Sequence, residues 1–196
     1  MHTSLDSISL DQLFLEARSF NQFSERPVDE EAVTALYGLL KWAPTSMNCQ
    51  PARYIFLRSS ESRHRLLPAL SEGNLVKTQN APMTVIIAYD TQFYEHLNTQ
   101  FSAYDARPMF IENQQLAEAT AFRNSSLQGA YLILAARALG LDCGGMSGFN
   151  PDIVNKEFFP DGRFAANFLV NLGYGAEGGC YPRGPRLDFN QVAEIL

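Results

Sequence analysis

The longest stretch of helical periodicity runs from Gln115 to Leu139, roughly 25 residues and so about 37 Å if it is helical throughout. Gly140 follows it as a natural C-terminal cap residue. One face mixes apolar, small and polar side chains: Leu116, Ala119, Arg123, Ser126, Leu127, Ala130, Tyr131 and Leu134. Phe122, Ile133 and Ala136 broaden the apolar surface, and a helix apolar nearly all round is buried on more than one side. We therefore expect either the central helix of the domain or a helix that also packs on its counterpart in a second subunit.

Shorter helices are predicted earlier in the chain. Ser9 and Gln12 form the pattern of a capping box that opens the first one. Its apolar face would be Leu10, Leu13, Phe14 and Ala17. The second begins near Pro27 with three acids in its first turn, where the helix dipole favours them. Its buried stripe would be Val33, Leu36, Tyr37 and Leu40. Residues 61–70 are also helical in pattern, and Pro68 lies near their end.

Residues 52–57, 83–89 and 164–172 have the composition of strands, and the glycine-rich segment 141–149 is expected to form a strand and turn. The run 83–89 is apolar and β-branched without alternation, which is typical of a central strand covered on both faces. Asn150 and Pro151 predict the start of a further short helix. Strands separated by helices indicate a layered fold of α and β elements.

Residues 90–114 show no clean period, and aromatic side chains alternate irregularly with polar ones. A long stretch without obvious structure inside a compact domain is often a lid or binding loop. The alternative is that the segment contains a short helix whose buried face the hydrophobic pattern does not reveal.

The segment Pro44–Pro51 lies between a predicted helix and a predicted strand. Its two prolines make it stiff, and Thr45, Ser46, Asn48 and Gln50 carry short polar groups. An uncharged, planar, hydrogen-bonding ligand would suit such a loop. An ordinary helix-to-strand connection would use the same residue types.

Residues 173–178 match the dinucleotide pattern G-x-G-x-x-G and follow a predicted strand. That fingerprint requires a helix directly afterwards and an acid at the end of the next strand. Gly179, Pro182, Gly184 and Pro185 forbid the helix, and too little chain remains. We therefore reject a Rossmann site here.

Length, charge and cysteine content narrow the class of protein. The 196 residues fit a single domain, 1–196, and the net charge of −6 argues against nucleic-acid binding. Three cysteines at unrelated spacings favour a reducing compartment. No metal-ligand spacing, signal peptide or spanning apolar run is found, so we expect a soluble cytoplasmic protein without a resident metal or membrane contact.

Three pairs of side chains are candidate binding groups. Arg18 and Ser19 could hold an anion, and so could Arg183 with Arg186 in the C-terminal tail. Asn74 and Lys77 would point to one side of a helical turn. Each pair taken alone could also be solvated surface. The chain has no P-loop, no G-x-S-x-G, no H-E-x-x-H and no catalytic Cys with a plausible His partner, so dispersed donors and arginines favour a large cofactor.

In chain order, the motifs R-S-x-x-x-F, P-T-S-x-N-x-Q-P, N-x-x-K and G-x-x-x-G-F resemble the FMN-dependent nitroreductase family over roughly residues 10–190. K-W-x-P-T-S-x-N, A-F-R-N-S-S, G-L-D-x-G-x-M-S-G-F and P-R-L are similar to its malonic semialdehyde reductase subgroup, from pyrimidine catabolism. The resemblance implies an α+β fold with a mostly antiparallel central sheet flanked by helices. It also implies a homodimer with FMN at the subunit interface.

The resemblance further implies a set of cofactor contacts. Arg18, Ser19, Arg186 and Arg183 would bind the FMN phosphate, near Asn21, which stands where the family usually has a second basic residue. Many members also have a basic residue in place of Ala17. The flavin itself would be contacted by Pro44, Thr45, Ser46 and Asn48 of the partner and by Asn74, Lys77, Ser147 and Gly148. Many members carry an acid in place of Ser147.

The resemblance implies a two-step reaction without a protein nucleophile. NADH or NADPH would deliver hydride to flavin N5, with Lys77 as electrostatic support, and an acceptor would then take it. If the acceptor is malonic semialdehyde, giving 3-hydroxypropanoate, Arg53 or Arg107 is expected to pair with its carboxylate. The alternatives are a broad nitro or quinone reductase and, outside the enzymes, a flavin-free helical dimerisation module.

Overall fold

The computed structural model describes residues 3–196. Its strands are β1 (Ala52–Leu57), β2 (Met83–Asp90), β3 (Asp142–Met146) and β4 (Phe164–Gly173). Its α-helices are α1 (Ser7–Leu10), α2 (Glu30–Leu40), α3 (Ser60–Leu66), α4 (Glu72–Asn80), α5 (Leu97–Gln100), α6 (Arg107–Ile111), α7 (Gln114–Ala138), α8 (Pro151–Phe158) and α9 (Phe189–Val192). Single turns of other helix types are η1 (Asp11–Leu15), η2 (Ser46–Asn48), η3 (Leu67–Ala69) and η4 (Phe93–His96).

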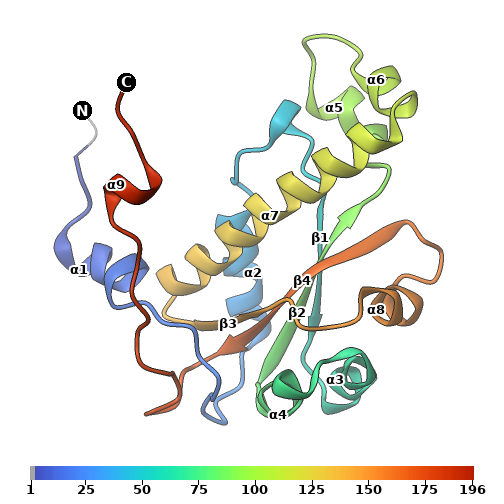
Figure 1. Ribbon diagram of the computed structural model, residues 1–196. Helices are drawn as coiled ribbons and strands as arrows, with labels where there is room; N and C mark the ends of the chain where they lie inside the picture. Colours follow the sequence, from blue (N-terminus) through green and yellow to red (C-terminus); the bar gives the residue numbers. More distant parts are fainter. Residues whose placement is uncertain (1–2) are drawn as a thin grey trace.

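The four strands form one sheet in the order β1-β2-β4-β3, and every neighbouring pair is antiparallel. β2 is an interior strand, as its apolar sequence predicts, and six of its eight residues are buried in succession. The register between β2 and β4 shifts once, between Ile87 and Ala88. The layered α+β arrangement with an antiparallel sheet is thus confirmed (Figure 1).

Each face of the sheet has its own hydrophobic core. Met83, Val85 and Ile87 of β2 pack in the cluster that contains buried residues of α2 and α7. Ile86 and Ala88, which point the other way, pack in the cluster formed with α3, η3 and α8. The helices therefore cover both faces, and α7 lies across one of them (Figure 1).

The long helix begins one residue before its predicted start and ends at Ala138, and Gly140 has the expected positive φ of 74°. Its buried face differs from the one its pattern singles out. The buried residues are mostly small or polar: Ala117, Thr120, Ala121, Asn124, Ser125, Gln128, Gly129, Leu132, Ala135 and Ala136. Leu127 and Tyr131, on the predicted face, are 45% and 38% exposed in the single chain. Helix α7 lies so close to the sheet that small side chains are needed between them. At Gly129, for example, a Cβ would lie 2.3 Å from Phe168 Cζ.

The predicted capping box of Ser9 and Gln12 is wrong. Ser9 does not cap the first helix, because Asp6 occupies that position and its carboxylate accepts a hydrogen bond from Ser9 N at 2.7 Å. Gln12 instead donates through Nε2 to the carbonyl of Arg137. Segment 90–114 contains η4, α5 and α6, which confirms the alternative of a short helix there, and each of these helices is too short to show a period.

The helix prediction for 61–70 covers two elements, α3 and η3. Pro68 lies inside η3, so the α-helix ends before it. The second helix is present but begins at Glu30, three residues after Pro27. Asp29 is its N-cap, so two of the three acids lie in its first turn, and Tyr37 of the predicted buried stripe is exposed.

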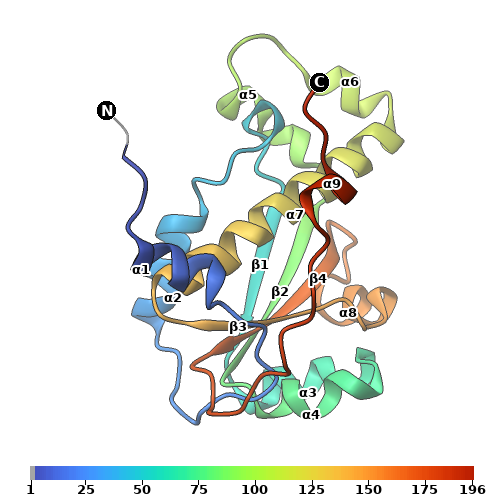
Figure 2. The ribbon, with the colours of Figure 1, turned by 60° about the vertical axis from the view of Figure 1, so that its left-hand side comes forward.

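The N-terminal segment after η1 extends the sheet beyond β3. Ser19 forms a parallel bridge with Cys143, and Phe20 N donates to the carbonyl of Cys143 at 2.9 Å. Gly144 permits this approach, because a Cβ there would lie 2.3 Å from the carbonyl oxygen of Phe20. Residues 17–24 are therefore fixed beside the end of β4 and the C-terminal tail. Figure 1 shows α1 and α9 on the same side of the sheet, and Figure 2 shows that side turned forward.

Candidate functional site: an arginine-lined cradle and its neighbouring groove

A pocket of about 320 Å³ forms where the N-terminal segment, the end of α7 and the tail meet. Its lining residues are Ala17, Arg18, Ser19, Asn21, Arg137, Tyr181, Pro182, Arg183, Gly184 and Arg186. All five residues predicted around a phosphate are among them, although up to 168 positions separate them in the chain. We call this pocket the arginine cradle.

The four arginines of the cradle are held by backbone carbonyl groups and not by acids. Arg18 donates to the carbonyl of Tyr181, and Arg183 Nη2 donates to the carbonyl of Leu15 at 2.5 Å. Arg137 Nη1 donates to the carbonyl of Leu13 at 2.9 Å, and Arg186 Nη1 to that of Gly184 at 2.9 Å. None of the four forms an ion pair with a carboxylate anywhere in residues 3–196. In a chain of net charge −6, four guanidinium groups without acidic partners in one pocket make it a candidate anion site.

Arg137 is the member of the cradle that the sequence does not reveal. A basic residue in the last turn of a helix is expected from the helix dipole alone, so its position carried no functional signal. Only the packing of α7 against the N-terminal segment brings it beside Arg18.

The tail reaches the cradle because it stays extended beyond β4. Asn21 N donates to the carbonyl of Gly179 at 2.8 Å, and Phe23 bridges to Gly175. Residues 174–188 form no helix, which confirms that the G-x-G-x-x-G match is not a dinucleotide fingerprint.

A groove of about 500 Å³ adjoins the cradle and shares Asn21 and Tyr181 with it. Lys77 of α4 lines this groove, beside Val76 and Asn80. Burial lowers the pKa of the Lys77 ammonium group from its usual value. No acid pairs with this ammonium among the described residues, so an electronegative ligand atom in the groove would find an available donor.

Asn74 lies one turn before Lys77 and is almost fully buried. Its Nδ2 donates to the carbonyl of Gly148 at 2.8 Å, which joins α4 to the segment after β3. Ser147 and Gly148 lie in an open hollow next to the start of α4. The structure thus brings the predicted pair Ser147–Gly148 beside Asn74.

The loop Pro44–Pro51 is strained and held from α7. Met47, Asn48 and Gln50 have positive φ values of 53°, 50° and 41°, which side-chain-bearing residues rarely adopt. Ser46 N donates to Asn124 Oδ1 at 2.8 Å.

Within one chain, this loop is remote from the cradle. Asn124, which holds Ser46, and Arg137, in the cradle, are 13 positions apart on α7, about 20 Å along the helix. The structure of a single chain therefore does not bring Pro44, Thr45, Ser46 and Asn48 to the other predicted site residues.

Both arginines predicted to bind a substrate carboxylate already have acidic partners. Arg53 Nη2 lies 2.7 Å from Oδ2 of Asp90, a residue only 1% exposed that also binds Arg163 at 2.6 Å. Arg107 Nη2 lies 2.9 Å from Oδ2 of Asp105. The hydrogen bonds that Asp105 accepts from Arg107 lower the pKa of the Asp105 carboxyl group.

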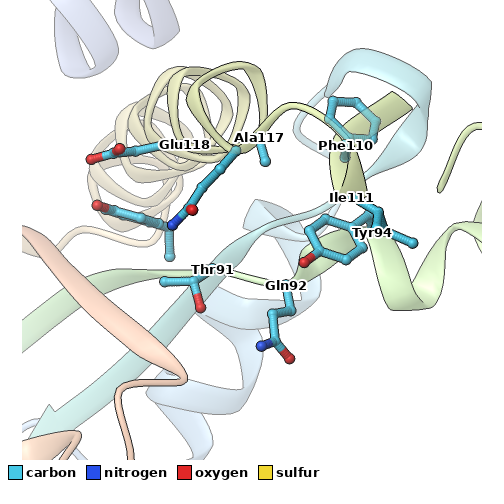
Figure 3. A pocket seen from close by; sticks show the side chains of 9 residues that line it. Thr91, Gln92, Tyr94, Phe110, Ile111, Ala117 and Glu118 are labelled. Atoms are coloured by element: carbon cyan, nitrogen blue, oxygen red, sulfur yellow. The ribbon is translucent and has the colours of Figure 1, made fainter. Parts of the chain in front are cut away.

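A separate pocket of about 440 Å³ lies at the N-terminal end of α7 (Figure 3). Two aromatic side chains from residues 90–114, Tyr94 and Phe110, help to line it. Their rings are stacked with an interplanar angle of 9°. Thr91, Gln92, Gln114 and Glu118 add polar groups to it. The interleaved aromatics of residues 90–114 were its only sequence signal, and no predicted site residue lines it.

Two of the three cysteines are buried thiols of low reactivity. Burial raises the pKa of Cys49 to about 11 and that of Cys143 to about 12. Across residues 3–196 no three His, Cys, Asp or Glu side chains cluster as metal ligands, and no helix is long and apolar enough to cross a membrane. The cradle and groove bring the predicted phosphate-binding residues and Lys77 together, and so form the principal candidate site.

The sequence matches the family model described as the nitroreductase family over residues 15–174. A candidate NADH dehydrogenase/NAD(P)H nitroreductase of Polynucleobacter asymbioticus is 52% identical over 196 residues, all of both chains. A relative of the same description from Burkholderia lata is 55% identical over 193 residues, 98% of this chain and 99% of the relative.

Solved structures agree in fold at lower identity. A candidate nitroreductase of Bacillus subtilis superposes with a TM-score of 0.86 at 21% identity, covering 97% of this chain and 100% of that one. A candidate nitroreductase of Exiguobacterium sibiricum in complex with FMN gives a TM-score of 0.82 at 20% identity, covering 100% and 99%.

Proposed function

Because the chain belongs to the nitroreductase family, we propose that it is an FMN-dependent oxidoreductase that passes hydride from NADH or NADPH to nitroaromatic or quinone acceptors. The observation that carries the proposal is the arginine cradle. Its four guanidinium groups have no acidic partners among the described residues, which suits a phosphate monoester. The names of the relatives refer to NADH and NAD(P)H, which supports the proposed reductant, and the FMN complex of a structure with the same fold supports the proposed cofactor.

The cradle and groove fit FMN in their chemistry and their order. Arg18, Arg137, Arg183 and Arg186 would bind the phosphate, and Ser19 and Asn21 would add neutral donors. The groove continues from there to Lys77, so the ring system would extend toward α4.

Lys77 would lie at the pyrimidine edge of the ring, where its positive charge favours negative charge that develops there. Asn74, Ser147 and Gly148 would contact the ring beyond it. FMN, when bound, supplies the hydride chemistry at its N5 atom, so no protein nucleophile is required.

We also propose that the active protein is a homodimer. Pro44, Thr45, Ser46 and Asn48 are about 20 Å from the cradle of their own chain, as measured along α7, and could reach the ring bound by a partner. Exposed apolar side chains supply a surface for association. They include Tyr37, Leu39 and Trp42 around the end of α2, Phe122, Leu127 and Tyr131 on α7, and Phe14 and Leu15 near the N-terminus.

The acceptor is proposed to be a broad class and not malonic semialdehyde. The subgroup resemblance points to that aldehyde, but Arg53 and Arg107, its expected carboxylate partners, are engaged by Asp90 and Asp105. The names of the relatives refer to nitroreductase activity, and none of them refers to an aldehyde substrate.

The deciding experiment begins with the visible spectrum of the purified protein. Bound flavin should be released as FMN in about one equivalent per chain. Values of kcat/KM with NADH are then compared for a nitroaromatic, a quinone and malonic semialdehyde. A preference for the aldehyde would overturn the proposed acceptor class. A colourless protein that takes up no added FMN would overturn the proposed function and leave a helical association module.

A further inference from the structure

Ser71 occupies the N-cap position of α4 but does not cap that helix. Its backbone is extended, with φ −66° and ψ 151°, and its side chain accepts no hydrogen bond from a backbone N–H of the first turn, only one from Asn74 Nδ2 at 3.3 Å. Ser59 has nearly the same backbone before α3, with φ −73° and ψ 152°, and there the side chain accepts from Ser62 N. A serine at this position ordinarily caps its helix, so the hydroxyl of Ser71 has a different task.

That hydroxyl belongs to a set of three donors on one carbonyl group. Ser71 Oγ donates to the carbonyl oxygen of Gly148 at 2.6 Å, Ser71 N donates to it at 3.0 Å, and Asn74 Nδ2 donates to it at 2.8 Å. A carbonyl oxygen has two lone pairs, so this acceptor is saturated.

The same contacts fix the turn that Gly148 occupies. Phe149 N donates to the carbonyl of Ser147 at 3.0 Å, and Phe149 also bridges to Leu70. The carbonyl groups of Ser147 and Gly148 are therefore both engaged. Their own N–H groups donate to no backbone or side-chain group among residues 3–196, and both residues are exposed.

We propose that Ser71 is a positioning residue, whose hydroxyl holds the Gly148 carbonyl so that the N–H groups of Ser147 and Gly148 are presented as fixed donors to a hydrogen-bond-accepting ligand edge. This inference rests on the proposed function in one respect only, that the ligand is the FMN ring. Position 148 must be glycine for the arrangement to form, because a Cβ there would lie 2.4 Å from Ser71 Oγ and 2.8 Å from Asn74 Nδ2.

The test compares Ser71→Ala, Ser71→Thr and the matched control Ser59→Ala. Nitrogen-15 NMR spectra of the unliganded proteins report the amides of Ser147 and Gly148 directly. We expect these signals to shift or broaden in Ser71→Ala and to stay near their wild-type positions in Ser71→Thr, which keeps a hydroxyl. Ser59→Ala should lower stability to urea, since it loses a helix cap, and leave both amides unchanged.

A second measurement follows the loaded protein under anaerobic conditions. At saturating NADH, the rate constant for flavin reduction should fall about tenfold in Ser71→Ala, because small displacements of positioning groups are costly in rate. Ser71→Thr should recover most of the rate, and Ser59→Ala should not change it. The dissociation constant for FMN should change by less than about threefold, since the cradle arginines are untouched.

Two outcomes separate the possible failures. Unchanged amide signals and an unchanged reduction rate in Ser71→Ala would overturn the role of Ser71. A wild-type protein that binds no FMN would overturn the proposed function, and the amide signals of the unliganded variants would still decide whether Ser71 fixes the turn.

Discussion

Arg183 donates a hydrogen bond to the backbone carbonyl of Leu15, 168 positions earlier in the chain, and so ties the C-terminal tail to the end of η1. Arg137 makes an equivalent contact with the carbonyl of Leu13. The two arginines are therefore oriented by backbone oxygens of one short segment, and their charges remain available to an anion.

Arg137→Ala should weaken FMN binding about tenfold, because one charge-assisted contact to the phosphate is lost. Titration of the flavin-free protein with FMN, followed by flavin fluorescence, measures the dissociation constant. Arg65→Ala is the control, since Arg65 pairs with Glu157 outside the cradle and should leave the constant unchanged. Equal affinity in Arg137→Ala and the wild type would exclude Arg137 from the phosphate site.

Gly144→Ala should cost about 1–3 kcal/mol of unfolding free energy, because its Cβ would meet the backbone of Phe20 at 2.3 Å. The displaced N-terminal segment also carries Arg18 and Ser19, so FMN affinity should fall as well. Gly145→Ala is the matched control on the same strand, where a Cβ would meet nothing within 4 Å. Urea unfolding of both variants gives the comparison, and similar losses at the two positions would contradict the close approach described for Gly144.

Lys77→Met should stabilise the unliganded protein at pH 7. The folded state lowers the pKa of Lys77 by burial, so between the folded and unfolded pKa values the unfolded chain binds more protons and stability rises with pH. Below the folded-state pKa, the destabilisation caused by burying the charged Lys77 is fully present. Above the unfolded-state pKa it vanishes, because the amine is neutral in both states. Urea unfolding at pH 7 and at about pH 11 should therefore show the gain only at the lower pH. A gain of the same size at both values would point to side-chain packing and not to charge.

Asp90→Asn should destabilise the protein by about 3–5 kcal/mol, because it removes the buried partner of Arg53 and Arg163. Asp105→Asn, which breaks the exposed pair with Arg107, should leave the stability almost unchanged, because water screens that pair. Thermal or urea unfolding decides between them. If releasing Arg53 also raised kcat/KM for malonic semialdehyde, the ion pair with Asp90 would be what restrains that activity.

Elements with strong local signals could be predicted closely from the sequence. Strand β1 has the predicted bounds 52–57, and the long helix deviates by only one residue at each end, because Asn113 caps its start and Gly140 follows its end. The first helix was misplaced because Asp6 and Ser9 are both capable caps three residues apart. Helices of four or five residues, such as α5 and α6, are shorter than the window in which a period can be recognised.

Residues of the candidate site that belong to a family motif could be predicted from the sequence. Residues that only tertiary packing brings to the site could not. Arg18, Ser19, Asn21, Arg183 and Arg186 do line one pocket, as the resemblance implies. Arg137 and Ser71 carry no such mark, since a basic residue ending a helix and a serine beginning one have ordinary structural explanations. The face of α7 was misjudged because the sheet selects small side chains, which hydrophobic periodicity does not detect.

The arginine cradle is assembled from the first and last parts of the chain, and this order constrains when it can form during protein synthesis. Arg18 and Ser19 are made early, but Tyr181, Arg183 and Arg186 follow Ser19 by 162 or more positions. At about 5–20 residues per second, roughly 10–30 s separate the two groups. The nascent chain therefore carries one half of the cradle long before the other, and the cradle cannot form until Arg186 has emerged from the ribosome.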